Sequence, residues 1–258
     1  MVPTVLWGFR QKGILFSRLR KAVNRYAQCY RNHIQMKPFL FIFTIIFFLT
    51  SCDLKSSKQY CADAEKLEDQ GMYKEAIKLL DIALKKDDKF IRAYLNRGAD
   101  KSALGDFRGA IADYEKTLSL HTENTLALVN IGNNYKRLGD NRRAIVYYDK
   151  AFRTKGGEGI NFDYTPNNYF GLGKFDVPAR EIYFERAIAF YNIDSLKNAY
   201  HDFKYCINSN FMKADSYYYL GYIYLATSQK EIACKCFYQA KSFGDTASLT
   251  AIKKYCND

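Results

Sequence analysis

Side chains that could carry out chemistry are few in this sequence, and their spacing does not assemble a catalytic or metal site. Cys234 and Cys236 are two residues apart, so on a helix they point about 200° away from each other. No pair of histidines lies near them to complete a set of four metal ligands. The sequence also has no Gly-x-Ser-x-Gly, no His-Glu-x-x-His and no phosphate-cradling loop. We therefore expect a protein that is not an enzyme and that needs no metal or cofactor.

Cys52 is the single most informative residue, because it ends a short apolar run. Residues 39–50 form a stretch of 12 with only two threonines among the hydrocarbon side chains. A membrane-spanning helix needs about 20 such residues, whereas the core of a cleaved export signal needs roughly 7–15. The alternative is an uncleaved N-terminal anchor.

The order of Met36-Lys37, the apolar core and Leu49-Thr50-Ser51-Cys52 resembles the signal peptide and lipobox of bacterial lipoproteins. This resemblance implies that the signal is cut just before Cys52 and that the Cys52 sulfur carries lipid. The mature protein would then be anchored in the bacterial cell envelope, at the outer membrane, on its periplasmic or surface side. Residues 1–35 would be an upstream mis-start, with translation beginning at Met36, or an extended basic head; an organellar transit peptide is the other possibility.

Net charge changes its meaning once the signal is removed. Residues 1–51 hold eight Lys or Arg and no acid, so removing them lowers the formal charge from +12 to about +4. A basic domain suggests nucleic acid only when the charge lies on the folded part. We therefore predict no nucleic-acid partner.

Downstream of Cys52, residues recur every 34 positions. The series are Gly71, Gly105 and Gly139; Ala76, Ala110 and Ala144; Leu80, Tyr114 and Tyr148; and Ala199 and Ala233. This period and these residue types resemble the tetratricopeptide repeat, a helix-turn-helix unit. The resemblance implies an all-α, right-handed α-solenoid of about five repeats with a C-terminal capping helix. In the fourth and fifth repeats the turn glycine is replaced by Asp194 and Ser228.

Small residues recur early in the first helix of each repeat, where they let the two helices approach closely. They are Ala64, Gly98, Gly132, Ala187 and Gly221. Large aromatic side chains then fill the gaps, so most of the 22 tyrosines and 19 phenylalanines are expected in the core.

The period breaks once, between Ala144 and Ala199, which are 55 residues apart: one period plus 21 residues. The extra stretch is rich in glycine and also aromatic, with Phe162, Tyr164 and Phe170 among its members. Glycine and proline rule out a regular helix there. This loop either contacts a partner or only seals a joint between repeats.

Five cysteines lie downstream of the expected anchor, and an odd number leaves at least one thiol unpaired in an oxidising compartment. Residues 248–258 have the pattern of an amphipathic capping helix, with Leu249, Ile252 and Tyr255 on its apolar face. We expect a disulfide between Cys234 and Cys256 to attach this helix to the last repeat. The alternative is that both are buried, reduced cysteines.

The family resemblance also implies a protein or peptide partner on the concave surface lined by the first helices. Its inward positions correspond here to Arg92, Asn96, Asn130, Asn133, Lys136, Arg137, Phe184, Tyr191, Tyr218 and Tyr222. For Lys136 and Arg137, ordinary solvated side chains are the alternative. Cys61 and Glu65 occupy the positions of the family's carboxylate clamp, so that clamp is absent.

We therefore predict a membrane-anchored, non-catalytic scaffold for protein–protein interactions; the alternative is an envelope lipoprotein that binds a glycan or another ligand. The predicted organisation is 1–35 upstream, 36–51 signal, 52–56 tether, 57–158 repeats one to three, 159–179 insertion loop, 180–247 repeats four and five, and 248–258 cap. The repeats are framed at 57–90, 91–124, 125–158, 180–213 and 214–247.

Overall fold

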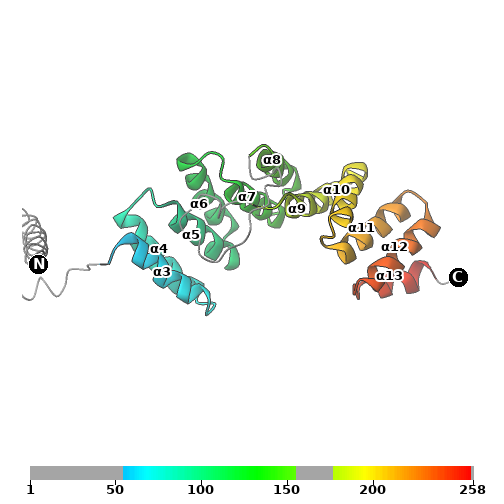
Figure 1. Cartoon of the computed structure of the whole chain (residues 1–258), viewed down its shortest axis with the longest axis horizontal. Coiled ribbons are helices and arrows are strands. Elements are labelled where there is room, and N and C mark those ends of the chain that lie inside the picture. The colour runs from blue at the N-terminus through cyan, green and yellow to red at the C-terminus, as the bar shows by residue number, and fades with distance from the viewer. Residues whose placement is uncertain (1–54, 155–176, 257–258) are drawn as a thin grey trace, which may run out of the picture. The chain divides into compact units, whose positions relative to one another are not determined.

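The computed structural model describes residues 55–154 and 177–256 of the 258-residue chain. The signal segment, Cys52 and most of the insertion lie outside the described residues. Within them the chain forms eleven helices and no strand (Figure 1). The helices are α3 Ser57–Glu68, α4 Tyr73–Lys86, α5 Ile91–Ala103, α6 Phe107–Leu120, α7 Thr125–Arg137, α8 Asn141–Phe152, α9 Ala179–Asn192, α10 Leu196–Asn208, α11 Lys213–Ala226, α12 Lys230–Ser242 and α13 Ser248–Tyr255.

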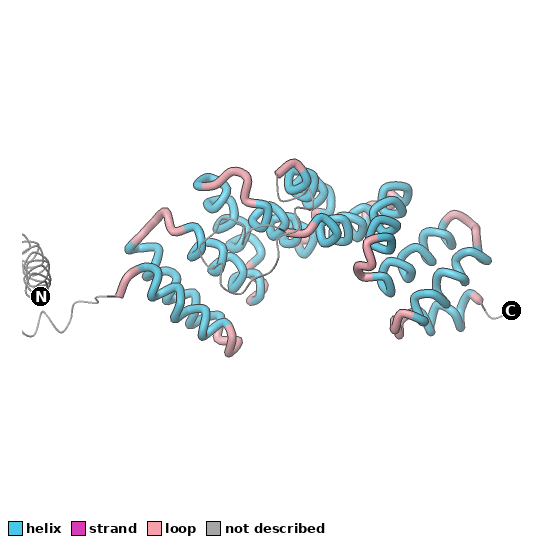
Figure 2. Tube along the Cα trace, viewed as in Figure 1, coloured by secondary structure: helices cyan, strands magenta, loops and turns pink. Residues whose placement is uncertain are grey.

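These helices form five helical hairpins joined by short turns, followed by a single final helix (Figure 2). Each helix packs against the next along the chain, and the first helices α3, α5, α7 and α9 also contact one another in turn. The all-α repeat fold is thereby confirmed. Two boundaries differ slightly: α9 begins at Ala179 and α11 at Lys213, each one residue before the predicted repeat.

The turn inside each hairpin depends on one residue in the left-handed region. Gly71, Gly105 and Gly139 have φ of 73°, 84° and 82°. Asp194 and Ser228 adopt the same conformation, with φ of 57° and 59°, although a side chain there costs about 1–2 kcal/mol. The repeat geometry therefore persists where the glycine is missing, at an energetic cost.

Close packing inside a hairpin joins a glycine to an aromatic ring 16 residues later. A Cβ added to Gly98 would lie 2.8 Å from the Tyr114 ring, and one added to Gly132 would lie 2.6 Å from the Tyr148 ring. Tyr114 and Tyr148 are almost fully buried. Gly221 receives a phenylalanine in the same way. These rings are core residues, as expected.

The joints between successive repeats alternate in character. At the first joint, Arg97 of α5 bonds Asp81 of α4 and Asp113 of α6. The third joint is built in the same way from Arg186, Asp149 and Asp202. The second and fourth joints place Ile131 and Leu220 at the arginine position, and both are buried. Ionic and apolar joints thus follow one another along the chain.

The final helix α13 packs on α12, and the structure links Cys234 to Cys256 by a disulfide with a Cα–Cα distance of 5.6 Å. The apolar face of α13 differs from the prediction: Leu249 is 48% exposed, while Ala251 and Ile252 are buried. Since each residue turns a helix by about 100°, Leu249 lies about 60° from Ile252 and about 120° from Tyr255. It is therefore at the edge of the face formed by the buried Ser248, Ala251 and Ile252.

Candidate functional site

The structure places a groove of about 260 Å³ between α7 and α9, lined also by the segment that leads into α11. It is lined by Leu126, Val129, Asn130, Asn133, Val177, Glu181, Phe184, Glu185, Phe211 and Met212. Three of the predicted binding residues, Asn130, Asn133 and Phe184, are brought together here. Phe184 is only 8% exposed and its ring meets the Phe211 ring edge-on at 6.1 Å, so it forms the floor rather than a projecting contact.

The polar groups of the groove are the two asparagines and two glutamates. Asn133 Oδ1 accepts a hydrogen bond from the Tyr148 hydroxyl at 2.7 Å. This bond fixes the orientation of the Asn133 amide, so that its NH₂ group can donate to a ligand. The Asn130 side chain is close enough to the Tyr114 hydroxyl to oppose the rise in its pKa, which burial causes. Asn133 is thus held in place by a buried tyrosine of the second helix. Glu181 lies in the first turn of α9.

Lys136 and Arg137 lie at the end of α7. Lys136 forms an ion pair with Glu185 of α9 across the groove, so its charge is already compensated. Arg137 is exposed.

Arg92 and Asn96 lie away from the groove, on α5, and both bind one carboxylate of α3. The distance from Arg92 Nη2 to Glu65 Oε1 is 2.5 Å, and Asn96 Nδ2 donates to the same oxygen at 3.1 Å. These two predicted ligand-binding residues are therefore engaged within the protein.

The three predicted tyrosines belong to the C-terminal part of the array. Tyr191 meets the Tyr219 ring at 5.2 Å. Tyr218 and Tyr222 contact each other at 5.0 Å, and Tyr222 also approaches Tyr255 of α13 at 6.3 Å. All are half-buried. Of the ten predicted residues, only Asn130, Asn133 and Phe184 line the groove. The other seven are Arg92 with Asn96, Lys136 with Arg137, and the three tyrosines.

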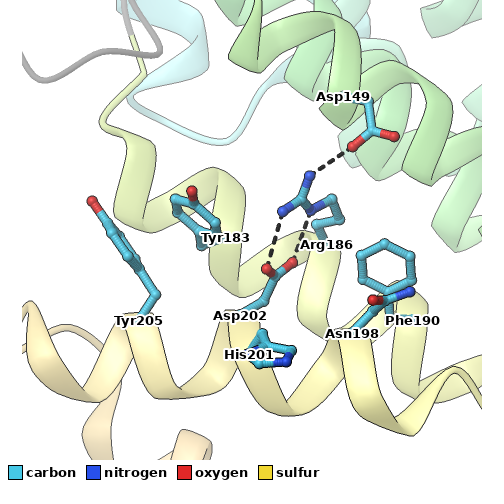
Figure 3. A pocket seen from close by; sticks show the side chains of 8 residues that line it. All are labelled: Asp149, Tyr183, Arg186, Phe190, Asn198, His201, Asp202 and Tyr205. Atoms are coloured by element: carbon cyan, nitrogen blue, oxygen red, sulfur yellow. Dashed lines mark hydrogen bonds and ion pairs between the residues drawn. The ribbon is translucent and has the colours of Figure 1, made fainter.

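A second hollow, of about 530 Å³, opens beside the third joint, between α8, α9 and α10 (Figure 3). Its lining comprises Asp149, Tyr183, Arg186, Phe190, Asn198, His201, Asp202 and Tyr205. Arg186 lies between the two aspartates, donating from Nη1 to Asp149 Oδ1 at 2.6 Å and from Nε to Asp202 Oδ2 at 2.8 Å. Burial raises the pKa of Asp202, although Arg186 opposes this. We call this hollow the outer pocket.

One pair of carboxyl groups, from α3 and α5, is not repeated at the matching positions of the later repeats that the structure describes. Glu68 Oε1 and Asp100 Oδ2 are buried without a hydrogen-bond partner. Burial, and next the charge of Glu68, raises the pKa of Asp100 to about 7, and burial also raises the pKa of Glu68. The same two positions one repeat later are Ser102 and Asn134, and there Ser102 Oγ donates to Asn134 Oδ1 at 2.9 Å. A protonated carboxyl would supply the donor that the serine supplies there.

Sequence reasoning missed several residues of the groove and the whole outer pocket. Val177 lies within the predicted insertion 159–179, where the 34-residue register is interrupted, so no spacing pointed to it. The outer pocket did leave a signal: Arg97 and Arg186 occupy the same repeat position once the 21 extra residues are removed, and each is followed 16 residues later by an aspartate.

The remaining thiols lack the features of reactive cysteines. Cys61, Cys206 and Cys236 are buried and reduced, and burial raises the pKa of Cys61 and Cys206 to about 12. In residues 55–154 and 177–256, no group of three or more His, Cys, Asp or Glu side chains could hold a metal ion. None of the helices described is both long enough and apolar enough to cross a bilayer.

Comparison with known proteins gives the fold. A model of the tetratricopeptide repeat matches residues 126–156. No curated protein matches the sequence. Among solved structures, YrrB, described as a TPR protein with an unusual peptide-binding site, is 20% identical with a TM-score of 0.59, over 76% of this chain and 90% of YrrB.

Two further solved structures are similar at low identity. PilW, a type IV pilus biogenesis factor, is 18% identical with a TM-score of 0.56, over 72% of this chain and 76% of PilW. PilF of Pseudomonas aeruginosa is 15% identical with a TM-score of 0.61, over 78% and 83% of the two chains. The described chain is therefore a tetratricopeptide-type array of helical repeats, which the repeat model itself matches at residues 126–156.

Proposed function

We propose that this protein is a membrane-anchored, non-catalytic adaptor that binds an extended segment of another cell-envelope protein in the groove between α7 and α9. The observation that carries the proposal is the convergence of two first helices and the start of α11 on one groove with an apolar floor and a fixed amide group.

The groove has the chemistry that an extended peptide requires. Leu126, Val129 and Phe211 offer an apolar surface for one or two side chains, and burial of such side chains supplies most of the affinity at peptide sites. The NH₂ group of Asn133 can donate to a backbone carbonyl, since its oxygen is committed to Tyr148. The tyrosine behind the amide fixes its orientation before the peptide arrives, which lowers the entropic cost of binding.

The anchor rests on the sequence around Cys52 and on where the fold begins. Ser56 caps α3, accepting from the Gln59 N–H while the Gln59 side chain accepts from the Ser56 N–H. The folded array thus starts directly after the expected tether 52–56, which supports a mature protein held close to the membrane surface. Cys52→Ala is expected to move the protein from the membrane fraction to the soluble fraction of cells.

The groove is tested by crosslinking in intact cells followed by affinity purification, comparing two matched variants. Met212 lines the groove and is 42% exposed, so Met212→Glu places a charge at the binding surface without entering the core. Met72 is 41% exposed and, like Met212, precedes a helix, but it lies outside the groove. Met72→Glu is therefore the control.

Loss of one recurrent protein partner with Met212→Glu, but not with Met72→Glu, is the expected result. Equal recovery of the partner with both variants would remove the site from the groove. Recovery of no protein, together with retention of soluble sugar, would favour the glycan-binding alternative.

A further inference from the structure

The outer pocket and the first ionic joint are the same structural unit built twice. In each, an arginine of a first helix is chelated by an aspartate of its own hairpin, and its remaining Nη1 bonds an aspartate of the preceding hairpin at 2.6 Å. The chelating bonds are 2.6–2.9 Å for Arg97 and 2.8–3.0 Å for Arg186. The two sites can therefore be compared group by group.

They differ by one cation. At the first joint, Lys101 lies four residues after Arg97, and its Nζ is 2.7 Å from Asp113 Oδ2, the oxygen that also accepts from Arg97 Nε. Two aspartates there face two cations. At the third joint the residue four positions after Arg186 is Phe190. Among the residues that the structure describes, Asp202 Oδ2 accepts from Arg186 Nε and from no second cation.

The third joint therefore carries one uncompensated negative charge among the described residues. Its charged and titratable groups are Asp149 from α8, Arg186 from α9, and His201 and Asp202 from α10. Asp149 is the more accessible acid, with 43% of its side chain exposed, against 7% for Asp202.

The surroundings of this charge suit a cation rather than an anion or a neutral group. The outer pocket opens where the first joint has its lysine, and the rings of Tyr183, Phe190 and Tyr205 line it. Tyr183 and Tyr205 stack with centroids 3.9 Å apart, and Tyr205 is 41% exposed. Aromatic faces beside a carboxylate attract an ammonium group both through the ring quadrupole and through charge.

We infer that the outer pocket receives the ammonium group of a lysine side chain from a partner protein, seated against Asp202 and Asp149 as Lys101 is seated against Asp113. The position of Lys101 beside Asp113 at the first joint serves as the model for how the partner's lysine would sit beside Asp202. This site lies outside the α7–α9 groove, and its occupation does not depend on the partner bound there.

The test uses the folded protein, without its signal segment and with no other partner bound. The solution is kept at about pH 8, where an ordinary imidazole is uncharged. A blocked Ala-Lys-Ala peptide is titrated against it at constant ionic strength, and the ring-proton NMR shifts of Tyr183 and Tyr205 are followed. The matched ligand control is the same peptide with norleucine in place of lysine, which keeps the apolar chain and removes the charge. Saturable shifts with the lysine peptide, and affinity at least about tenfold weaker with norleucine, are expected.

Two variants of the protein separate this site from general surface attraction. Phe190→Lys introduces at the third joint the residue type that Lys101 provides at the first. The ammonium of the new lysine should occupy the site and lower the affinity for the lysine peptide by about tenfold or more. Asp149→Asn keeps the shape of the pocket, removes its more exposed charge and should weaken the peptide in the same direction. Saturation that is equal for the two peptides, or that persists unchanged in Asp149→Asn, would overturn the inference, as would the absence of saturable shifts.

Discussion

Replacing Asp100 with asparagine should remove a pH dependence of stability that originates at the first joint of the array. In the wild-type protein, one oxygen of each carboxyl group, Glu68 Oε1 and Asp100 Oδ2, is buried without a hydrogen-bond partner, and burial raises the pKa of both groups. An asparagine at position 100 can donate to the Glu68 carboxylate at any pH. The variant therefore needs no bound proton at this joint.

The sign and the size follow from the pKa of Asp100, which is about 7 in the folded chain and about 3.9 when unfolded. Between about pH 4 and pH 7 the folded protein holds a proton that the unfolded chain has lost, so the free energy of unfolding falls as pH rises. Above about pH 7 neither state holds it, and the loss is complete. A difference of roughly 3 pKa units corresponds to about 4 kcal/mol, as an upper estimate.

The measurement is urea unfolding at several pH values between about 4.5 and 8, for wild type, Asp100→Asn, and the double variant Glu68→Ser with Asp100→Asn. The double variant copies the Ser102–Asn134 pair of the next joint. Hydrogen exchange of the α3 and α5 amides should accompany it, since the end repeat of an array can unfold separately.

From the lowest to the highest pH, the unfolding free energy of the wild type should fall by about 2–4 kcal/mol relative to that of either variant. Titrating groups other than Glu68 and Asp100 are shared and cancel in this difference. A difference that stays constant within about 0.5 kcal/mol would refute the role given to this pair.

Three further changes have expected outcomes. Gly132→Ala should lower the free energy of unfolding by about 1–3 kcal/mol, because its Cβ would lie 2.6 Å from the Tyr148 ring; chemical denaturation measures it. Ser228→Gly should raise thermal stability by about 0.5–1 kcal/mol by relieving a left-handed side chain, and an unchanged or lower melting temperature would contradict this. Cys256→Ser should cost about 2–4 kcal/mol and release α13, seen as faster amide exchange in that helix; equal exchange with and without reductant in the wild type would argue against the disulfide.

The periodicity of the sequence was sufficient to predict the hairpins, since the 34-residue recurrence of glycine and of small residues reflects packing inside each repeat. Gly98 with Tyr114, and Gly132 with Tyr148, are separated by 16 residues in both cases. The spacing in the sequence therefore predicts the contact between each glycine and its tyrosine ring. The disulfide partners could be proposed for a similar reason, because Cys234 and Cys256 lie on consecutive helices.

The binding surface was harder to predict because a position in a repeat does not determine what neighbouring side chains do. Arg92 and Lys136 both occupy inward positions, yet each forms an ion pair with a glutamate of an adjacent first helix. Phe184 lines the groove but is almost buried, since Phe203 and Phe211 pack against its ring. Such pairings join residues that are 19 to 49 positions apart, and the insertion before α9 separates Lys136 from Glu185 in a fixed register.

The alternation of the joints has a consequence for how an array of this kind can lengthen during evolution. A duplicated single repeat would place an apolar joint beside another apolar joint, or leave an arginine such as Arg97 without the aspartate of the preceding hairpin. A duplicated pair made of the second and third repeats carries Arg97 with Asp113 and keeps its internal apolar joint at Ile131. At the new junction Arg97 would meet Asp149, the residue that already pairs with Arg186 at the third joint. Two repeats, rather than one, are thus the smallest segment that can be copied without altering any junction.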